Sequence, residues 1–252
     1  MNSTLIMNPY KTVFNGLALA AFGITGVGLK AQEQPNILII LADDMGYSDL
    51  GCYGGEIRTP NLDALAGKGI RFTQFYNTSR CCPTRASLLT GLYPHETGVG
   101  HLTGRSMGAG YMGYLNDSCT TIAEILSKAG YSTALAGKWH VGNNRDAWPG
   151  NRGFQHYYGI HNYVDSYLNV LEQCEVYEDG MMVIPATHMP SADTVTSKEW
   201  YTTDVFTDKA IRYIDQAVSQ RKPFFQYLAF NSPHWPLEAH NEDIQYYPIT
   251  RS

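Results

Sequence analysis

Apolar positions along the chain follow two different periods, one typical of buried strands and one typical of helices. A continuous apolar run over 37–42 predicts a strand that is buried on both faces, as in a parallel sheet. Residues 131–136 predict a short strand, and residues 224–230 predict another buried strand. Residues 70–76 alternate between apolar and polar, which predicts a further strand. Because helical segments separate these runs, the pattern indicates right-handed crossovers and an α/β fold.

Helix signals fill the segments between the predicted strands. Thr59 is placed to cap a helix that has Pro60 in its first position and ends at Gly67. A capping box opens the segment 121–130, and its apolar residues repeat at helical spacing. The segment 199–220 has the same spacing. The helices over 121–130 and 199–220 therefore each have one apolar face to pack on the predicted sheet.

The segment 141–198 is harder to interpret. Asp179-Gly180 between apolar flanks predicts a hairpin. Tyrosines and histidines gather between His156 and Tyr167. They form either a wall that binds a sugar or an aryl group or a packed ribbon, and the sequence leaves both readings open.

Residues 1–31 have the features of a secretory signal. Lys11 precedes an apolar run over 13–29, and small residues before Gln32 offer a cleavage site. A membrane anchor is the alternative, but Asn15 and four glycines interrupt the run and no basic cluster follows it. We therefore expect an exported protein, periplasmic or extracellular, with no stable membrane span and with a folded part over 32–252.

The amino-acid composition argues against some classes of binding partner. A formal net charge of -5 and 16% charged residues indicate a globular protein and argue against nucleic acid. Five cysteines in an exported chain leave at least one thiol outside any disulfide. Since no Cys-x-x-Cys pair occurs, a zinc ribbon is not expected.

Two carboxylates, Asp43 and Asp44, directly follow the first predicted strand. Ligands bind at this end of the strands in open α/β sheets. Adjacent carboxylates repel each other unless a cation lies between them, and oxygen ligands suit Ca²⁺ or Mg²⁺. An isolated Asp-Asp pair is more often a solvated turn, but the position after a buried strand favours a metal site.

The stretch 79–91 carries the most specific chemistry. Pro83 suits a first helical turn and Gly91 suits the end of the helix, so Cys81 lies at the helix N-terminus with Arg85 one turn on. Free N–H groups and the guanidinium would bind an anion and favour a reactive thiolate. A buried pair formed by Cys81 and Cys82 is the alternative reading.

Two further candidates follow predicted strands. Lys138 and His140 lie two residues apart, so an extended backbone would point both side chains the same way. Together they would hold an anion and move a proton. His234 stands between two prolines just after the strand 224–230. Taken alone, each of these residues is more often a surface or structural feature.

Four motifs together closely resemble those of the type I sulfatases. They are Ala-Asp-Asp-x-Gly at 42–46, Cys-x-Pro-x-Arg followed by Ala-Ser-Leu-Leu-Thr-Gly at 81–91, the segment 130–140 that ends in Gly-Lys-Trp-His, and Pro-His-x-Pro at 233–236. The resemblance runs from about Pro35 to Pro236. It departs from the family at Arg80, where a small or aliphatic residue is more usual. The fold that it implies is the alkaline-phosphatase-like α/β sandwich with a mostly parallel central sheet flanked by helices.

The resemblance also implies residue roles. Cys81 would be oxidised to formylglycine by a maturation enzyme, and its hydrate would attack the sulfur of a sulfate monoester. Arg85 would hold the nucleophile and His140 would assist its deprotonation, while Lys138 and His234 would bind the sulfate. Two alternatives remain, namely a phosphonate or phosphate monoester hydrolase of the same superfamily and a non-catalytic glycan-binding remnant.

The metal and the substrate are also implied by the resemblance. Ca²⁺ would bind Asp43, Asp44 and the oxygen at position 81. The substrate would be an aryl sulfate or a sulfated sugar or glycan. Residues 238–252 are polar and offer no further strand–helix unit. The later metal ligands, a second sulfate-binding lysine and the C-terminal subdomain of the family have no counterpart. The sequence thus predicts the N-terminal portion of a sulfatase domain, truncated before that subdomain, with a weakened metal site and little turnover.

Overall fold

The computed structural model describes residues 34–104, 106–162, 166–168, 174–185 and 200–247. Contacts within the chain separate Met1–Gln34 from Pro35–Ser252, and every described element belongs to the second unit. The predicted signal segment 1–31 lies outside the described residues. Within the described part, no helix is long and apolar enough to cross a membrane.

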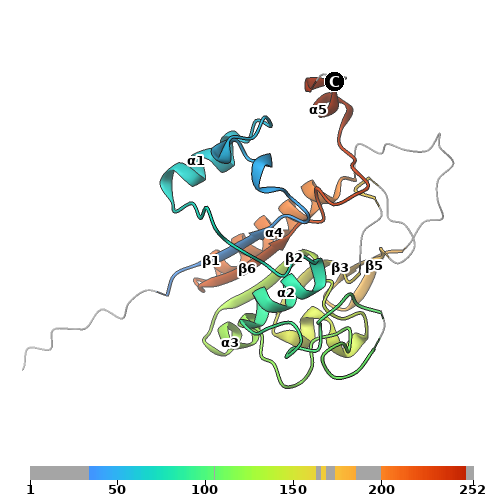
Figure 1. Cartoon of the computed structure of the whole chain (residues 1–252). Coiled ribbons are helices and arrows are strands. Elements are labelled where there is room, and N and C mark those ends of the chain that lie inside the picture. Colours follow the sequence, from blue (N-terminus) through green and yellow to red (C-terminus); the bar gives the residue numbers. More distant parts are fainter. Residues whose placement is uncertain (1–33, 105, 163–165, 169–173, 186–199, 248–252) are drawn as a thin grey trace, which may run out of the picture. The chain divides into compact units, whose positions relative to one another are not determined.

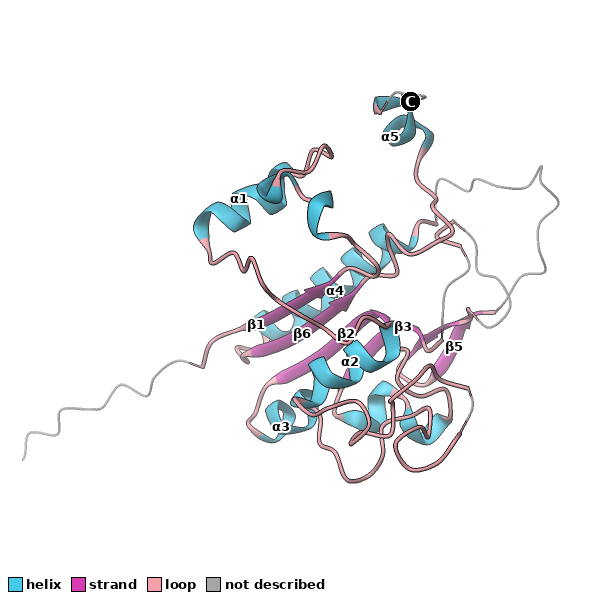
Figure 2. Ribbon diagram, viewed as in Figure 1, coloured by secondary structure: helices cyan, strands magenta, loops and turns pink. Residues whose placement is uncertain are grey.

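A six-stranded sheet in the order β1-β6-β2-β3-β4-β5 forms the centre of the unit (Figure 2). The first four strands in this order run parallel, and β4 and β5 add an antiparallel hairpin. The strand bounds are β1 Ile37–Leu41, β2 Ser132–Lys138, β3 His156–Ile160, β4 Val176–Glu178, β5 Met181–Ile184 and β6 Phe224–Ala229. The predicted mostly parallel sheet and the hairpin at Asp179-Gly180 are confirmed.

Helices cover both faces of this sheet (Figure 1). α2 and α3 lie on one face and α4 lies on the other. The helix bounds are α1 Pro60–Lys68, α2 Cys81–Thr90, α3 Ile122–Lys128, α4 Thr202–Ser219 and α5 Asn241–Tyr246. Short 3-10 turns span Tyr47–Asp49, Gly51–Tyr53, Arg145–Ala147 and Pro149–Arg152.

Alternation along the central strands builds two apolar cores. On β6, Phe225 and Tyr227 face the core shared with α2 and α3, whereas Leu228 faces the core shared with α4. Phe206 of α4 fills the second core. Successive side chains of a strand point to opposite faces, so a central strand needs apolar residues on both. The α/β sandwich follows from this requirement.

Two strand predictions were wrong in part. Residues 70–76 form no strand, and Ile70 and Phe75 are exposed to 84% and 78%. β1 is not buried on both faces, because it lies at the sheet edge and Leu38 and Ile40 are about half exposed. A strand needs a hydrogen-bonding neighbour and cover for its apolar face, and the sequence pattern shows neither.

Local helix predictions were closer to the structure. The capping box that opens α3 is present, with the Thr121 hydroxyl accepting from the Glu124 N–H. α1 runs one residue beyond the predicted end at Gly67, and Thr59 bonds the Asp63 carboxylate instead of capping the helix backbone. The short helix α5 was not predicted.

Candidate active site

The candidate residues meet where the parallel strands end. Asp43 follows β1, Lys138 is the last residue of β2, His140 lies two residues further on, and His234 follows β6. Cys81 is the first residue of α2, and α2 packs on the face of the sheet that also carries α3. Parallel strands direct their carboxyl ends to one edge, so segments far apart in the sequence converge there.

Asp43 is the buried anion of the site. Its Oδ1 lies 3.2 Å from Nη2 of Arg85, and its Oδ2 lies 2.5 Å from Nζ of Lys138. Burial alone would raise the pKa of Asp43, but the two cations outweigh burial and hold the pKa below its ordinary value. Repulsion between Asp43 and Asp44, which the sequence suggested, is therefore offset by protein cations.

Arg85 is fully buried and fixed by several acceptors. Its Nη1 donates to the Lys138 carbonyl at 2.9 Å and to the Tyr227 hydroxyl at 3.4 Å. Burial opposes the charge, but Tyr227 and Asp43 raise the pKa of Arg85 above its ordinary value. Tyr227 was not among the sequence candidates. The sequence signal that could have identified Tyr227 is a hydroxyl-bearing side chain within the buried strand β6.

Cys81 and Cys82, the first two residues of α2, carry thiols that lie close together. A hydrogen bond with the Cys82 thiol is the largest cause that lowers the pKa of Cys81, to about 3; burial opposes the shift, and His140 and Lys138 add to it. The same hydrogen bond and burial raise the pKa of Cys82. Cys81 is thus the thiolate and Cys82, which is fully buried, is its donor. The role of Cys82 was not predicted from the sequence.

His140 is buried against Cys81. Burial lowers the pKa of His140, and the hydrogen bond to Cys81 only partly opposes the shift. Its φ of 55° lies in the left-handed region, so the extended alternation expected from Lys138 does not continue to His140. The two residues do reach one site, but a turn of the backbone places His140 there. A neutral imidazole in this position is a proton acceptor.

Asp44 and His234 form the more exposed side of the site. Asp44 has a left-handed backbone with φ of 65°, which turns it away from its buried neighbour. Its Oδ2 lies 3.6 Å from Nε2 of the half-buried His234. The Tyr167 hydroxyl donates to the His234 carbonyl and ties this loop down.

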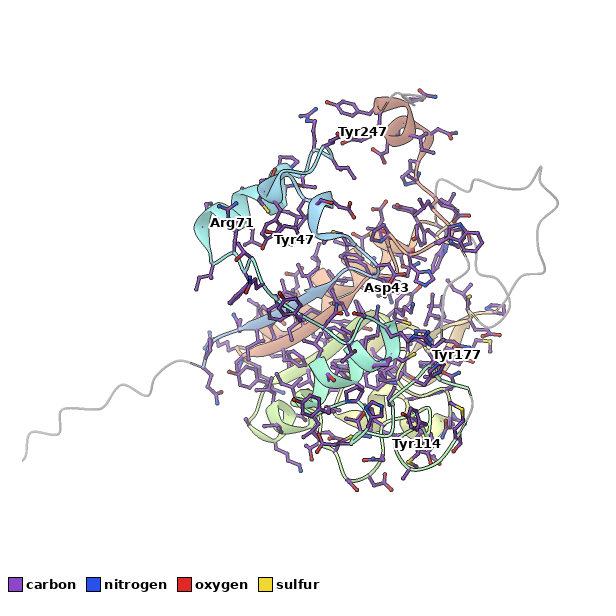
Figure 3. All side chains as sticks on the ribbon, viewed as in Figure 1. Asp43, Tyr47, Arg71, Tyr114, Tyr177 and Tyr247 are labelled. Atoms are coloured by element: carbon purple, nitrogen blue, oxygen red, sulfur yellow. The ribbon has the colours of Figure 1, made fainter. Side chains whose placement is uncertain are left out.

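A cavity of about 180 Å³ opens between these groups. Asp43, Asp44, Cys81 and Arg85 line it, as do residues that the sequence analysis missed, Asn77, Ser79, Arg80 and Thr84. Figure 3 labels Asp43 beside the strand ends. Lys138, His140 and His234 are not in the cavity wall but contact residues that are. The structure thus brings all seven predicted site residues into one linked group.

The side chains that line this cavity include oxygen donors of the kind that bind Ca²⁺. Asp43, Asp44 and Asn77 offer the carboxylate and amide oxygens that this ion takes. A metal ion here would share Asp43 with Arg85 and Lys138. The residues present fit Ca²⁺ in kind, while its usual 6–8 oxygens exceed what these side chains supply.

Comparison with known proteins gives consistent results. The family model named Sulfatase matches residues 35–251. The arylsulfatase of Klebsiella aerogenes is 37% identical over 231 residues, which are 87% of this chain and 47% of that protein. The N-acetylgalactosamine-6-sulfatase of Canis lupus familiaris is 35% identical over 232 residues, covering 88% and 44%.

A solved structure, Ps i-CgsB in complex with k-i-k-neocarrahexaose, has a similar fold. It superposes with a TM-score of 0.72 and 32% sequence identity over 87% of this chain and 50% of its own. The chain therefore spans about half the length of the proteins that it matches.

Proposed function

Because the chain belongs to the sulfatase family, we propose that it forms the part of a sulfatase domain that carries the nucleophile for hydrolysis of sulfate monoesters. One observation carries the proposal. Cys81 begins α2 in hydrogen-bond contact with His140, next to the buried group formed by Asp43, Arg85 and Lys138. This arrangement combines a nucleophile, a base and two cations around a pocket.

Position 81 supplies the nucleophile after maturation. In the proposal a maturation enzyme converts Cys81 to formylglycine. One hydroxyl of its hydrate attacks sulfur and breaks the S–O bond to the substrate alcohol, which leaves with a proton. The second hydroxyl then loses its proton and re-forms the aldehyde as the C–O bond to the sulfate breaks. His140 accepts the proton from the attacking hydroxyl, because burial keeps its ring neutral near pH 7. Cys82 remains a buried donor that orients the side chain at position 81.

The cations stabilise negative charge on the sulfuryl group. Arg85 holds the oxygen at position 81, and Lys138 acts on the sulfuryl oxygens while both stay anchored by Asp43. Arg85 and Lys138 are buried away from water and held in place, so they need little rearrangement as negative charge develops on the sulfuryl oxygens. His234 approaches from the side of Asp44 and serves the sulfate or the leaving group. Ca²⁺, held by Asp43, Asp44 and position 81, would supply further positive charge.

The proposed substrates are sulfated sugars or glycans. One relative is named an N-acetylgalactosamine-6-sulfatase, and one similar structure contains a neocarrahexaose. The aromatic group of Trp148, His161 and Tyr177 lines a separate cavity of about 220 Å³ and would suit a sugar ring. We also propose that residues 1–31 direct export and are removed, so that the mature chain begins at Gln32. Intact mass of the exported protein would test the cleavage.

The chemistry is tested with the full chain produced beside a formylglycine-generating enzyme. Peptide mass spectrometry should find an aldehyde at position 81 and a thiol at Cys82. Hydrolysis is then compared for the sulfate and the phosphate ester of one phenol. Faster release from the sulfate ester supports the proposal, and faster release from the phosphate ester favours a phosphate or phosphonate hydrolase.

Two matched variants separate the adjacent cysteines. Cys81→Ala should abolish hydrolysis, because it removes the nucleophile. Cys82→Ala should leave much of it, since only an orienting hydrogen bond is lost. An aldehyde at Cys82, or a loss of activity confined to Cys82→Ala, would overturn the assignment. An aldehyde at position 81 without any hydrolysis would agree with a glycan-binding role and also with the little turnover that the sequence predicts for this part of a sulfatase domain.

A further inference from the structure

The two adjacent cysteines offer a chemistry that sulfate hydrolysis does not use. The Sγ atoms of Cys81 and Cys82 and a ring nitrogen of His140 all lie within 4.8 Å of one another. Cys82 is fully buried and His140 is 5% exposed, whereas Cys81 faces the pocket. Two sulfurs and an imidazole from two separate segments thus converge on one point.

We propose that, before any conversion of Cys81, these three side chains bind one thiophilic divalent cation of the Zn²⁺ class. Thiolate sulfur and imidazole nitrogen are the preferred ligands of Zn²⁺ and are poor ligands for Ca²⁺. Three protein ligands with one position open toward the pocket is a common arrangement for zinc. This inference concerns the cysteine form of the chain and goes beyond the proposed hydrolysis.

An independent observation at His140 supports the site. Its Nδ1 is buried and has no hydrogen-bond partner among the described residues. Buried polar atoms without a partner are rare in folded proteins. No described group bonds Nδ1, so the ring nitrogen that lies within 4.8 Å of the two sulfurs is free to adopt the tautomer that a metal ion requires. The left-handed backbone at His140 holds the ring against the two thiols.

The local charges allow a cation at this point. Lys138 and Arg85 are close to the cluster, but both are ion-paired with Asp43. Binding would displace the proton of the Cys82 thiol to solvent, and the two thiolates would then balance the charge of a divalent ion. Asp43 and Asp44 line the same pocket with oxygen donors, which suit a hard cation, whereas the two sulfurs and the imidazole suit a soft one. Position 81 is shared, as a sulfur ligand before conversion and as an oxygen ligand after it.

The proposed site would affect maturation. A cation bound to Sγ of Cys81 occupies the atom that the maturation enzyme must oxidise. Conversion of Cys81 to formylglycine in turn removes one thiolate and weakens the site. The cysteine form would therefore bind the cation, and the aldehyde form would not.

Cobalt provides a direct test with the reduced, tag-free full chain made without the maturation enzyme. Co²⁺ bound to thiolates has an intense near-ultraviolet charge-transfer band, and Zn²⁺ should displace it. We expect one Co²⁺ per chain. Because loss of even an outer-shell partner typically costs about 10–100-fold in metal affinity, Cys82→Ser should weaken binding at least about tenfold. Cys81→Ser, at a half-buried position, repeats the test if Cys82→Ser fails to fold.

Cys52 provides the matched control, because it is a half-buried thiol outside the cluster. Cys52→Ser should leave the band and the affinity unchanged. No charge-transfer band in the wild-type chain, or a band that survives both Cys81→Ser and Cys82→Ser, would overturn the proposal. The readout needs no turnover, so it is independent of whether the chain hydrolyses sulfate esters.

Discussion

Asp43 is the residue on which the charged interior of the pocket depends. It is 5% exposed and pairs with Arg85 and Lys138, which are fully buried. Buried cations are stable only when paired, because charge loses its hydration on burial. Any change at this carboxylate therefore affects three residues at once.

We predict that Asp43→Asn destabilises the chain by about 3–5 kcal/mol, because removal of one partner leaves buried charge uncompensated. Urea unfolding measures the change. Asp44→Asn is the matched control: the Asp44 side chain is 61% exposed, so its loss should cost no more than about 0.5 kcal/mol. Equal effects of the two substitutions would contradict the assignment of Asp43 as the structural anion.

Cys81 should react as a thiolate in the folded, unconverted chain. Since its pKa is lowered to about 3, the thiolate fraction is already complete at pH 6 and does not grow toward pH 8. The alkylation rate with iodoacetamide should thus change little between these pH values. In the urea-unfolded chain, with an ordinary pKa of about 8.5, the same peptide should react on the order of 10²-fold faster at pH 8 than at pH 6. A steep rise in the folded chain would refute the lowered pKa.

At the scale of elements, the close approach of central strands decides the geometry of the site. A Cβ at Gly137 of β2 would lie 1.9 Å from the Ala229 carbonyl oxygen of β6, and Gly137 has φ of 117°. Real Cβ atoms never approach a backbone atom so closely. Glycine here allows β2 to deliver Lys138 and His140 beside Cys81.

We predict that Gly137→Ala costs more than about 4 kcal/mol or prevents folding, because it combines overpacking with an unfavourable φ. Gly67→Ala on α1 is the control, since a Cβ there meets nothing within 4 Å. It should stabilise the chain by up to about 1 kcal/mol through helix propensity. Urea unfolding and yield of soluble protein measure both. A harmless Gly137→Ala would show that β2 and β6 are not this close.

At the scale of the whole molecule, the chain exposes apolar side chains on the edge strand β1 and along residues 70–76. Leu38 and Ile40 on β1 are about half exposed, and Ile70, Phe75 and Tyr76 are more than three-quarters exposed. Apolar patches and open sheet edges promote association. The exposed face of β1 and the exposed side chains of residues 70–76 are therefore surfaces on which this chain can associate.

We predict that the chain associates as its concentration rises and that Phe75→Lys reduces this association. Phe75 is 78% exposed, so a lysine should disturb no core while adding charge to the patch. Val218→Lys on α4, at a position that is 58% exposed on another element, should have a smaller effect. Static light scattering across a concentration series makes the comparison. Equal effects would indicate general charge repulsion.

Several features could be predicted from residues alone because they are local. The ends of α2 follow from Pro83 in its first turn and from Gly91, which has φ of 73°. The apolar face of α4 follows from the spacing of Phe206, Ala210 and Ala217. The hairpin at Asp179-Gly180 follows from turn chemistry. Asp43, Lys138 and His234 were identified because each stands just after a strand signal, and the motifs placed them together.

Other features needed the folded chain because they depend on neighbours distant in sequence. Residues 70–76 alternate like a strand yet have no partner strand among the described residues, and β1 lies at an edge although its sequence is that of a central strand. The pairing of Asp43 with two cations, the Cys82 donor to Cys81, the Tyr227 anchor and the left-handed turn at His140 arise only from packing. By itself, the sequence determined the strands β1, β2 and β6, the helices α1 to α4 and the residues brought to the site, because periodicity, capping and turn chemistry act over a few residues. The tertiary structure decided which charges neutralise one another and which thiol ionises, because those energies depend on burial and on distances across the sheet.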